Sequence, residues 1–461
     1  MRRRNRRSAA ALAAVLAVVT VGCPAAGAIT PPEVDSAATP PPGTAGALQT
    51  MAQRGACTVT GVIPGTDPAT TSPNQQGLDL TEAWRYSRGD GQNVAVIDTG
   101  VQPGPRLPNV EAGGDFVAST DGLTDCDGQG TMVAGLIAGQ PGAEGFSGVA
   151  PGAQLLSIRQ TSAKFSPNQP GQDPVIVEAN NDIATLARAV VRAVDLGATI
   201  INISSVACVP ANTAIDQSAL GAALRYAAVE NDVVIVAAAG NTGGGIAGGT
   251  GCAANPLTDP ARPEDPRNWA GVTSVSTPSW WQPYVLSVGA LNPLGQPAPF
   301  SMSGPWLGLA APGENITSLS NRPDGGLANG QPNDKGELAP VSGTSYAAAY
   351  VSGVAALVRS RFPELSAEQV VRRLTITARG ADRSPSSLVG AGTVDPVAAL
   401  TWDVPGPGSP AETTKPVAAP LEPVQDDHTG RNVAYTGTGV LALAAALTAA
   451  FAAHRRKDKA A

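Results

Sequence analysis

The sequence predicts an α/β protein whose parallel sheet is covered by helices on both faces. Short apolar runs, such as Val94–Ile97 and Val233–Ala237, alternate along the chain with longer segments of helical periodicity. Strands buried on both faces of a sheet are continuously apolar, and parallel strands need a long crossover, usually a helix, between them. The regular alternation of the two kinds of segment therefore indicates a doubly wound parallel sheet.

Length and composition leave room for a large core and for many turns. The chain has 461 residues, of which 43% are hydrophobic and 4% are aromatic, with 53 glycines and 41 prolines. Its formal net charge is −7. An acidic chain offers phosphates no electrostatic attraction, so we expect no nucleic-acid partner.

The first 28 residues have the three parts of a secretory signal. Five arginines open the chain, an apolar run follows from Ala9 to Val21, and small residues end at Ala28. We predict a signal peptide over residues 1–28, removed after Ala28. Cys23 raises a lipoprotein alternative, although Thr20 is poorly suited to the position where lipoprotein signals carry Leu or Val.

The other end of the chain predicts a membrane anchor. Residues 433–453 contain no charged side chain, and the basic segment 454–461 follows them. A run of this length can cross a bilayer, and trailing positive charge favours the cytoplasm. We therefore expect one transmembrane helix, with the large domain on the extracytoplasmic side of the cell membrane. An Ala-rich core helix is the alternative. Residues 403–432 are Pro-rich and polar, which is typical of a spacer.

Four cysteines remain once the predicted signal is removed: Cys57, Cys126, Cys208 and Cys252. An even number in an exported chain predicts disulfides. Three pairings are open, and order along the chain favours Cys57 with Cys126 and Cys208 with Cys252. No cysteine spacing matches a zinc site, so we expect no metal and no cofactor.

The N-terminal arm, residues 29–77, is rich in Pro, Thr, Ala and Gly in its first part and lacks sustained periodicity. A short helix between Leu78 and Tyr86 opens the domain, which we place at residues 78–402. The first core strand, Val94–Ile97, ends in Asp98. Ligands of open α/β sheets bind beyond the carboxyl ends of the strands, which makes Asp98 a candidate site residue. The alternative is that Asp98 is an ordinary turn-forming residue before Gly100, since the local pattern would be the same.

The middle of the chain supplies the next elements. We expect an apolar helix ending near Gly139, a strand ending at Ile158, a helix over 183–194, a strand at Ile200–Ile203, a helix over Ala219–Val229, and a strand over Val233–Ala237. Two turn-rich stretches, Thr161–Asn181 and Thr242–Ser279, are predicted to be surface loops near the site.

Val341–Arg359 runs from a small-residue turn into an apolar helix that presents Ser345. In the first turn of a helix, unpaired N–H groups and the positive end of the dipole favour developing negative charge. Ser345 is therefore a candidate nucleophile, although an ordinary capped core helix would look the same in isolation. Ser366 and Gln369 form a capping box on the closing helix, Ala367–Ala378.

Four segments together resemble the subtilisin-like serine peptidases in content and order. They are Val94–Gly100, the Gly128–Gly135 stretch, Ala239–Asn241 and Gly343–Ala347. The terminal segments are similar to those of mycosins, membrane-anchored subtilases of actinobacterial type VII secretion. This resemblance implies a subtilisin-like fold, type VII secretion membrane components as partners and, if the protein is active, a peptide or protein substrate.

By position, the resemblance assigns roles to three residues. Asp98 would orient the catalytic base, Ser345 would be the nucleophile, and the side chain of Asn241 would donate to the oxyanion. The histidine position of the family is occupied by Gln129. An amide is not basic at physiological pH, so it cannot take the proton of a serine hydroxyl.

No other histidine replaces the missing base, because His428 and His454 both lie outside the subtilase-like domain. In a well-studied subtilisin, loss of the histidine lowers turnover by about a million-fold. Met132 stands where many subtilases have a second histidine, and Ala349 where the family usually has proline. We therefore predict a catalytically impaired pseudoprotease with a structural role in the secretion machinery.

Several alternatives stay open. An active serine endopeptidase would need another base, for which Asp125, Asp127 and Lys164 are the nearest candidates, or a histidine supplied by the substrate. A third class is a peptide-binding module that holds a segment without cutting it. Codons for His and Gln differ by a single base. A sequence error at Gln129 in an active enzyme is therefore a further alternative.

Overall fold

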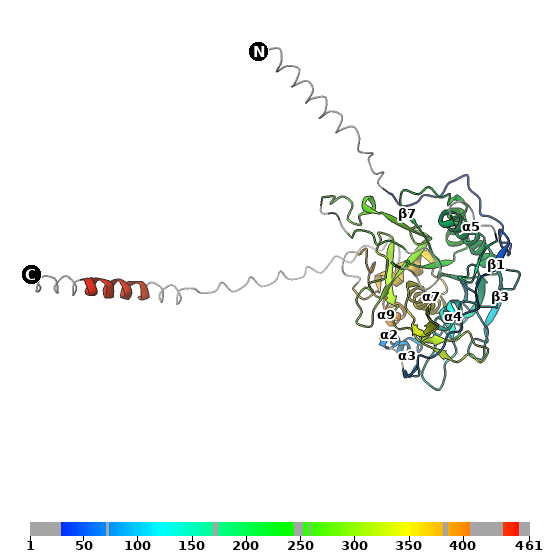
Figure 1. Cartoon of the computed structure of the whole chain (residues 1–461), viewed down its shortest axis with the longest axis horizontal. Coiled ribbons are helices and arrows are strands. Elements are labelled where there is room, and N and C mark those ends of the chain that lie inside the picture. Colours follow the sequence, from blue (N-terminus) through cyan, green and yellow to red (C-terminus); the bar gives the residue numbers. More distant parts are fainter. Residues whose placement is uncertain are drawn as a thin grey trace, which may run out of the picture. The chain divides into compact units, whose positions relative to one another are not determined.

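The computed structural model describes residues 29–70, 73–168, 174–243, 252–257, 259, 261–380, 386–405 and 437–450. The chain divides into two units after Val404, and the first unit holds the sheet and its helices (Figure 1). The predicted signal peptide and basic tail, and most of the predicted spacer, lie outside the described residues.

A seven-stranded sheet forms the centre of the first unit, in the order β11-β10-β8-β6-β2-β4-β3. Every neighbouring pair is parallel, which confirms the predicted sheet. The strands are β2 (Asn93–Asp98), β3 (Val110–Asp115), β4 (Gln154–Arg159), β6 (Ile200–Ile203), β8 (Val234–Ala238), β10 (Val285–Leu291) and β11 (Leu307–Pro312).

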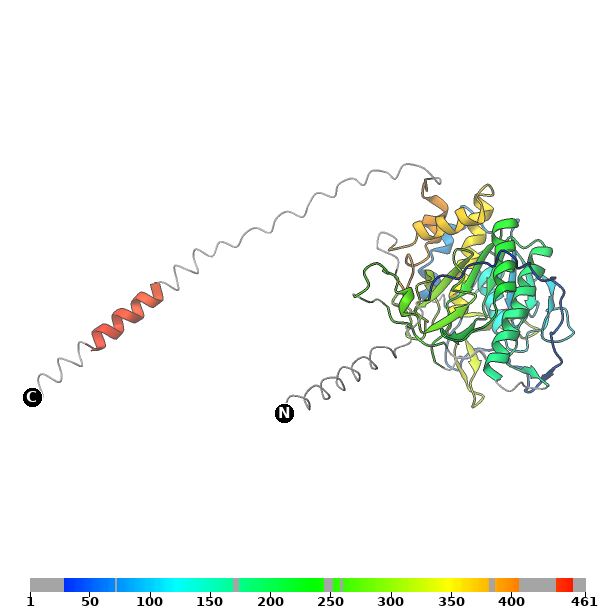
Figure 2. The same ribbon diagram turned by 90° about the horizontal axis from the view of Figure 1, so that it is seen from above.

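Alternate residues of the central strands face two separate cores. Val94 and Val96 of β2 belong to the core that contains α4 (Gln129–Ala138), α7 (Thr344–Arg361) and α8 (Ala367–Ile376). Ala95 and Ile97 belong to the core that contains α5 (Pro174–Asp195) and α6 (Ser218–Arg225). Helices therefore cover both faces of the sheet, as predicted (Figures 1 and 2).

Both predicted loops contain regular structure, and the predictions are wrong there. Helix α5 begins at Pro174, so the second half of Thr161–Asn181 is helical. Its first half contains β5 (Phe165–Pro167). Within Thr242–Ser279, β9 (Ser274–Thr277) pairs antiparallel with β7 (Ala207–Pro210). The fixed φ of a proline suits the first position of a helix, which is the signal that marks the start of α5.

Smaller elements complete the first unit. The predicted opening helix is short, with α3 spanning Leu80–Ala83, and α6 continues as a single π turn, Tyr226–Glu230. The capping box predicted at Ser366 is present, because its side chain accepts from the Gln369 N–H and the Gln369 side chain accepts in return. The closing helix of the unit is α9 (Pro396–Thr401).

The N-terminal arm is attached to the domain at several points. Strand β1 (Met51–Gln53) pairs antiparallel with β5, and Gly61 bridges to Gly330. A disulfide joins Cys57 to Cys126, with the two Cα atoms 4.4 Å apart. The second disulfide joins Cys208 of β7 to Cys252, with the Cα atoms 5.2 Å apart. Both bonds are the pairs that chain order favours.

Residues 437–450 are helical, and their apolar side chains, such as Leu441 and Leu443, are exposed. Among the residues that the structure describes, no helix combines the length and the apolar character that a membrane span requires. Both ends of the predicted span 433–453 lie outside the described residues, so the anchor stays a prediction.

Candidate active site

Asp98 lies at the carboxyl end of β2, fully buried. One carboxylate oxygen accepts a hydrogen bond from the backbone N–H of Thr99 at 2.6 Å. Burial raises the pKa of Asp98 to about 7, although hydrogen bonding by the Ser204 hydroxyl and the Thr99 N–H opposes this shift. The charge of Asp125 adds to the rise. Asp98 is therefore close to half protonated at neutral pH.

Gln129 is the first residue of α4, directly after Gly128, whose φ of 83° turns the chain into the helix. A Cβ on the next residue, Gly130, would lie 2.0 Å from the carbonyl oxygen of Gly100 and 3.3 Å from the Cβ of Asp98. The start of α4 therefore packs directly against Asp98. The Gln129 side chain is buried, and it makes no hydrogen bond to another residue in the described ranges.

The loop before α4 is held by Asp125. Its Oδ1 accepts from the Thr99 hydroxyl and from the N–H groups of Asp127 and Gly128. Its Oδ2 accepts from the N–H and the hydroxyl of Thr131 at 2.8 and 2.7 Å. Burial raises the pKa of Asp125, and these hydrogen bonds oppose the rise. The carboxylate is fully engaged in shaping the loop, so it is not free to act as a base.

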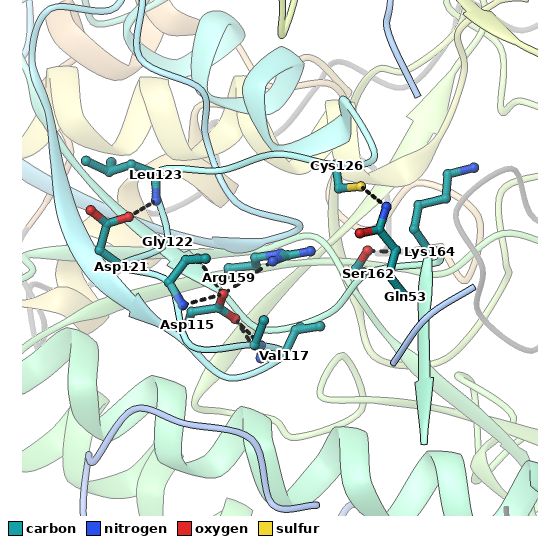
Figure 3. Close-up of polar contacts among 12 residues, drawn as sticks. Gln53, Asp115, Val117, Asp121, Gly122, Leu123, Cys126, Arg159, Ser162 and Lys164 are labelled. Atoms are coloured by element: carbon teal, nitrogen blue, oxygen red, sulfur yellow. Dashed lines mark hydrogen bonds and ion pairs between the residues drawn. The ribbon is translucent and has the colours of Figure 1, made fainter. Parts of the chain in front are cut away.

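The two other substitute bases are also engaged away from the serine. Asp127 accepts from the Ser162 hydroxyl and from the Ala163 N–H at 2.9 Å. Burial raises its pKa, while those bonds and the charges of Arg159 and Lys164 oppose the rise. The Lys164 side chain points away from Arg159 in Figure 3. Within the described part of the chain, no hydrogen bond joins these groups to the candidate nucleophile.

Ser345 is the second residue of α7, and it is buried. Its hydroxyl donates to the carbonyl oxygen of Ser204 at 3.0 Å. The serine proton therefore points at a main-chain carbonyl and not at a basic side chain. A helix of apolar and small residues, buried from Thr344 to Val358, holds Ser345 in this position.

Asn241 follows β8 and is aligned by the start of α7. Its Oδ1 accepts from the N–H and from the hydroxyl of Thr344 at 3.0 and 3.1 Å. Because the oxygen is fixed in this way, the amide nitrogen is the group left to donate. A Cβ on Gly343 would lie 3.6 Å from that nitrogen, so it faces the turn that leads into α7. This geometry suits a donor to an oxyanion.

Sequence reasoning missed two residues of the site. The carbonyl of Ser204 accepts from the Ser345 hydroxyl, and the side chain of Ser204 opposes the rise in the pKa of Asp98. Thr344 orients Asn241. Ser204 directly follows a predicted strand, so the rule that ligands lie at the carboxyl edge could have identified it. Thr344 offers no signal beyond its place beside Ser345.

The arrangement therefore contains a nucleophile at a helix N-terminus, an aligned amide donor and a buried carboxyl group. The group missing is a base between Asp98 and Ser345, where Gln129 begins α4. Among the described residues, no cluster of His, Cys, Asp and Glu could hold a metal ion that might activate the hydroxyl. The site can bind and polarise a carbonyl group, but no group in it is placed to deprotonate Ser345.

The Peptidase S8 profile, described as the subtilase family, matches residues 89–392. Mycosin-3 of Mycobacterium tuberculosis is 61% identical over 455 residues, which cover 98% of this chain and 99% of that protein. A structure of the MycP3 protease from the type VII (ESX-3) secretion system is 67% identical with a TM-score of 0.79, and covers 81% of this chain and 100% of that one. A chain in the intact ESX-5 inner membrane complex is 46% identical with a TM-score of 0.78, covering 91% and 99% respectively.

Proposed function

The chain belongs to the mycosin group of the subtilase family, and we propose that it is a catalytically impaired pseudoprotease, anchored in the membrane, that serves as a structural subunit of a type VII secretion system. The observation that carries this proposal is Gln129 at the start of α4, against Asp98, in a domain without histidine. The fold around the vacant base position is intact.

The chemistry of the site supports impairment. A serine hydroxyl attacks a carbonyl only if a base takes its proton, and the Gln129 amide has no basic lone pair at neutral pH. The oxyanion donor of Asn241 alone leaves about a thousand-fold acceleration over water. That is far below what an ordinary protease achieves.

Relatives support the proposed setting. A homologous chain occurs in the periplasmic assembly of the ESX-5 inner membrane complex, at 47% identity and a TM-score of 0.79. We propose that this protein likewise contacts membrane components of a type VII secretion system, with its large domain on the extracytoplasmic side and residues 433–453 as the anchor. Crosslinking followed by purification should recover those components equally from the parent and from Ser345→Ala. Recovery of the anchored chain alone would contradict a structural role.

The decisive test of impairment compares the parent with Gln129→His. We expect the parent to leave a mixed peptide library uncut and the variant to cleave it, with a gain of up to about a million-fold, the cost of losing this histidine in a subtilisin. The double variant Gln129→His/Ser345→Ala is the control, and it should be silent. If the parent cleaves and Ser345→Ala abolishes the activity, the site uses another base and the proposal is wrong.

The aligned Asn241 amide and the buried Ser345 hydroxyl also suit a second function, a serine endopeptidase with a non-standard base or a histidine supplied by the substrate. Cleavage restricted to peptides with a histidine just before the scissile bond would support substrate assistance. Absence of Ser345 labelling by a fluorophosphonate at every pH would argue against any activity of this kind.

A further inference from the structure

A cavity of about 450 Å³ lies outside the candidate active site, between the N-terminal arm, β5 and the first half of α5. Its lining includes none of Asp98, Gln129, Asn241 or Ser345. Most of the wall is apolar, and the apolar side chains include Met51, Phe116, Val117, Phe165 and Val177.

Two carboxylates, the exposed Glu178 and the half-buried Asp182, stand in this wall beside neutral polar side chains such as Gln160. They are four residues apart on α5, and therefore on the same face of the helix. In the part of the chain that the structure describes, neither side chain has a hydrogen bond or an ion pair. Burial raises the pKa of Asp182 to about 7, and the charge of Glu178 adds to the rise. Burial raises the pKa of Glu178 as well.

The basic side chains near the cavity are already engaged. Arg54 stands in the rim, but its guanidinium donates to the Ser166 hydroxyl and to the carbonyl oxygen of Pro167. Arg159 lies against the Phe165 ring, 4.7 Å from its centroid, and pairs with Asp115 at 3.3 Å (Figure 3).

Two further charged groups are Asp127, whose carboxylate accepts from the Ser162 hydroxyl, and Lys164, whose charge opposes the rise in the pKa of Asp127. None of these cations lowers the pKa of Glu178 or Asp182. The two carboxylates therefore lack a counter-ion, and a ligand that supplies one would gain free energy.

We propose that this cavity binds a lysine or arginine side chain from an extended segment of a partner protein, with the aliphatic stem against the apolar wall and the cationic head on Glu178 and Asp182. Long basic side chains bury their stems on apolar surface while the charge reaches a polar partner. A free cation would leave the apolar wall unused, and an apolar side chain would leave the carboxylates unpaired. The cavity is independent of Gln129 and Ser345, so the site exists whether or not the chain cuts peptides.

Binding of a cation favours the ionised form of Asp182, so the ligand displaces the proton that burial retains. Affinity should therefore rise as the pH rises through about 7 and fall below it.

The test uses the full chain in detergent and three probes. The first is the peptide acetyl-Ala-Ala-Leu-Lys-Leu-Ala-Ala-amide, the second has norleucine in place of lysine, and the third is free n-butylamine. We expect calorimetry to show that the lysine peptide binds at least about tenfold more tightly than either other probe, and about tenfold more tightly near pH 8 than near pH 5.5. Equal binding of the norleucine peptide, or of butylamine, would overturn the proposal.

The matched variants are Glu178→Gln/Asp182→Asn in the cavity and Asp334→Asn/Glu337→Gln, two exposed carboxylates in the turn between β14 (Gly330–Pro332) and β15 (Leu338–Pro340). The first should abolish binding of the lysine peptide and its pH dependence, and the second should change neither. If the first variant fails to fold, Glu178→Gln alone should still weaken binding several-fold. Unchanged affinity in the cavity variants, or no binding by the parent near pH 8, would overturn the proposal.

Discussion

Asp98 is buried beside an amide where an active subtilase has an imidazole. An imidazolium favours the carboxylate form of its neighbour, whereas Gln129 offers no positive charge. Burial is therefore the largest influence on Asp98, and its pKa rises to about 7. In the unfolded chain the same carboxyl titrates near 3.9. The native state thus holds a proton that the unfolded state releases, and Asp98 contributes to the pH dependence of the stability of the fold.

This difference predicts that Asp98→Asn stabilises the protein at alkaline pH. Between about pH 4 and pH 7 the unfolded state binds fewer protons, so the free energy of unfolding of the parent falls as the pH rises. Asparagine does not titrate, and the variant should gain roughly 3 kcal/mol over the parent between about pH 5 and pH 8. Thermal unfolding followed by circular dichroism at both pH values measures the gain.

Asp334→Asn, at an exposed site, is the control for that experiment and should show no such pH dependence. If the stability difference between Asp98→Asn and the parent is the same at both pH values, Asp98 is not protonated in the native state. In that case its pKa is not raised by burial.

Sequence motifs located the side chains of the candidate site but not the main-chain groups between them. Asp98, Gln129, Asn241 and Ser345 were found because side-chain chemistry has a signature in the sequence. The carbonyl of Ser204, which accepts the hydrogen bond of the Ser345 hydroxyl, has no such signature, since every residue carries a carbonyl. Five donors hydrogen-bond to the Asp125 carboxylate. The folded loop brings them together, so they cannot be predicted from the sequence.

At the scale of elements, α4 is positioned by the closeness of its first turn to β2. Gly130 makes this approach possible, because any side chain there would meet the Gly100 carbonyl oxygen. We expect Gly130→Ala to destabilise the protein by about 1–3 kcal/mol through overpacking. We expect this loss to exceed the gain in helix propensity from glycine to alanine, which is about 1 kcal/mol. Urea unfolding with an unchanged m-value measures the loss.

Gly326→Ala is the matched control, because the space around Gly326 is open and its φ does not require glycine. It should be close to neutral. A Gly130→Ala variant as stable as the parent would mean that α4 shifts easily. In that case the position of Gln129 against Asp98 is not held by packing.

The strands that the sequence predicted are those dominated by large apolar residues. Strands β2, β4, β6 and β8 have this character, with single polar interruptions at Ser157 and Asn202, and they occupy adjacent central positions in the sheet. Strand β3 has two glycines and two acidic residues and lies at an edge, where one side needs no burial. The apolar residues of β10 are interrupted by Ser287 and Gly289, and β11 contains Gly308 and ends in Pro312, so neither forms an unbroken hydrophobic run.

At the scale of the whole molecule, the Cys57–Cys126 bond connects the arm to the loop that leads into α4. It closes a loop of 69 residues, and its removal should cost about 4 kcal/mol if loop entropy dominates. We expect Cys57→Ser/Cys126→Ser to lower the free energy of unfolding and to expose the arm to proteolysis. Limited trypsin digestion with N-terminal sequencing detects the new cleavage sites, among which Arg54 is the expected one.

Cys208→Ser/Cys252→Ser serves as the control, because it removes a bond of similar loop length, 44 residues, far from the arm in sequence. It should lower stability by a similar amount while the arm stays protected. Equal protection of Arg54 in both variants would show that the pairing of β1 with β5 alone holds the arm.

The fold of the large unit follows from local patterns, whereas the prediction of a membrane anchor follows from length and charge. The Ala-rich stretch at 433–453 is only weakly hydrophobic, so its length and its charged flanks carry the prediction of an anchor. The described part of that stretch, residues 437–450, is helical. Whether such a helix enters a bilayer depends on its surroundings, which the sequence of the helix does not contain.

The two disulfides have a consequence for how the protein matures. Each bond joins a cysteine to the next cysteine along the chain that remains after the predicted leader, with its Cys23, is removed. A chain that emerges N-terminus first presents Cys57 and Cys126 before Cys208 appears. Oxidation in order of emergence therefore yields the native bonds directly. Maturation of this protein should need an oxidant for its thiols but no isomerase to reshuffle them.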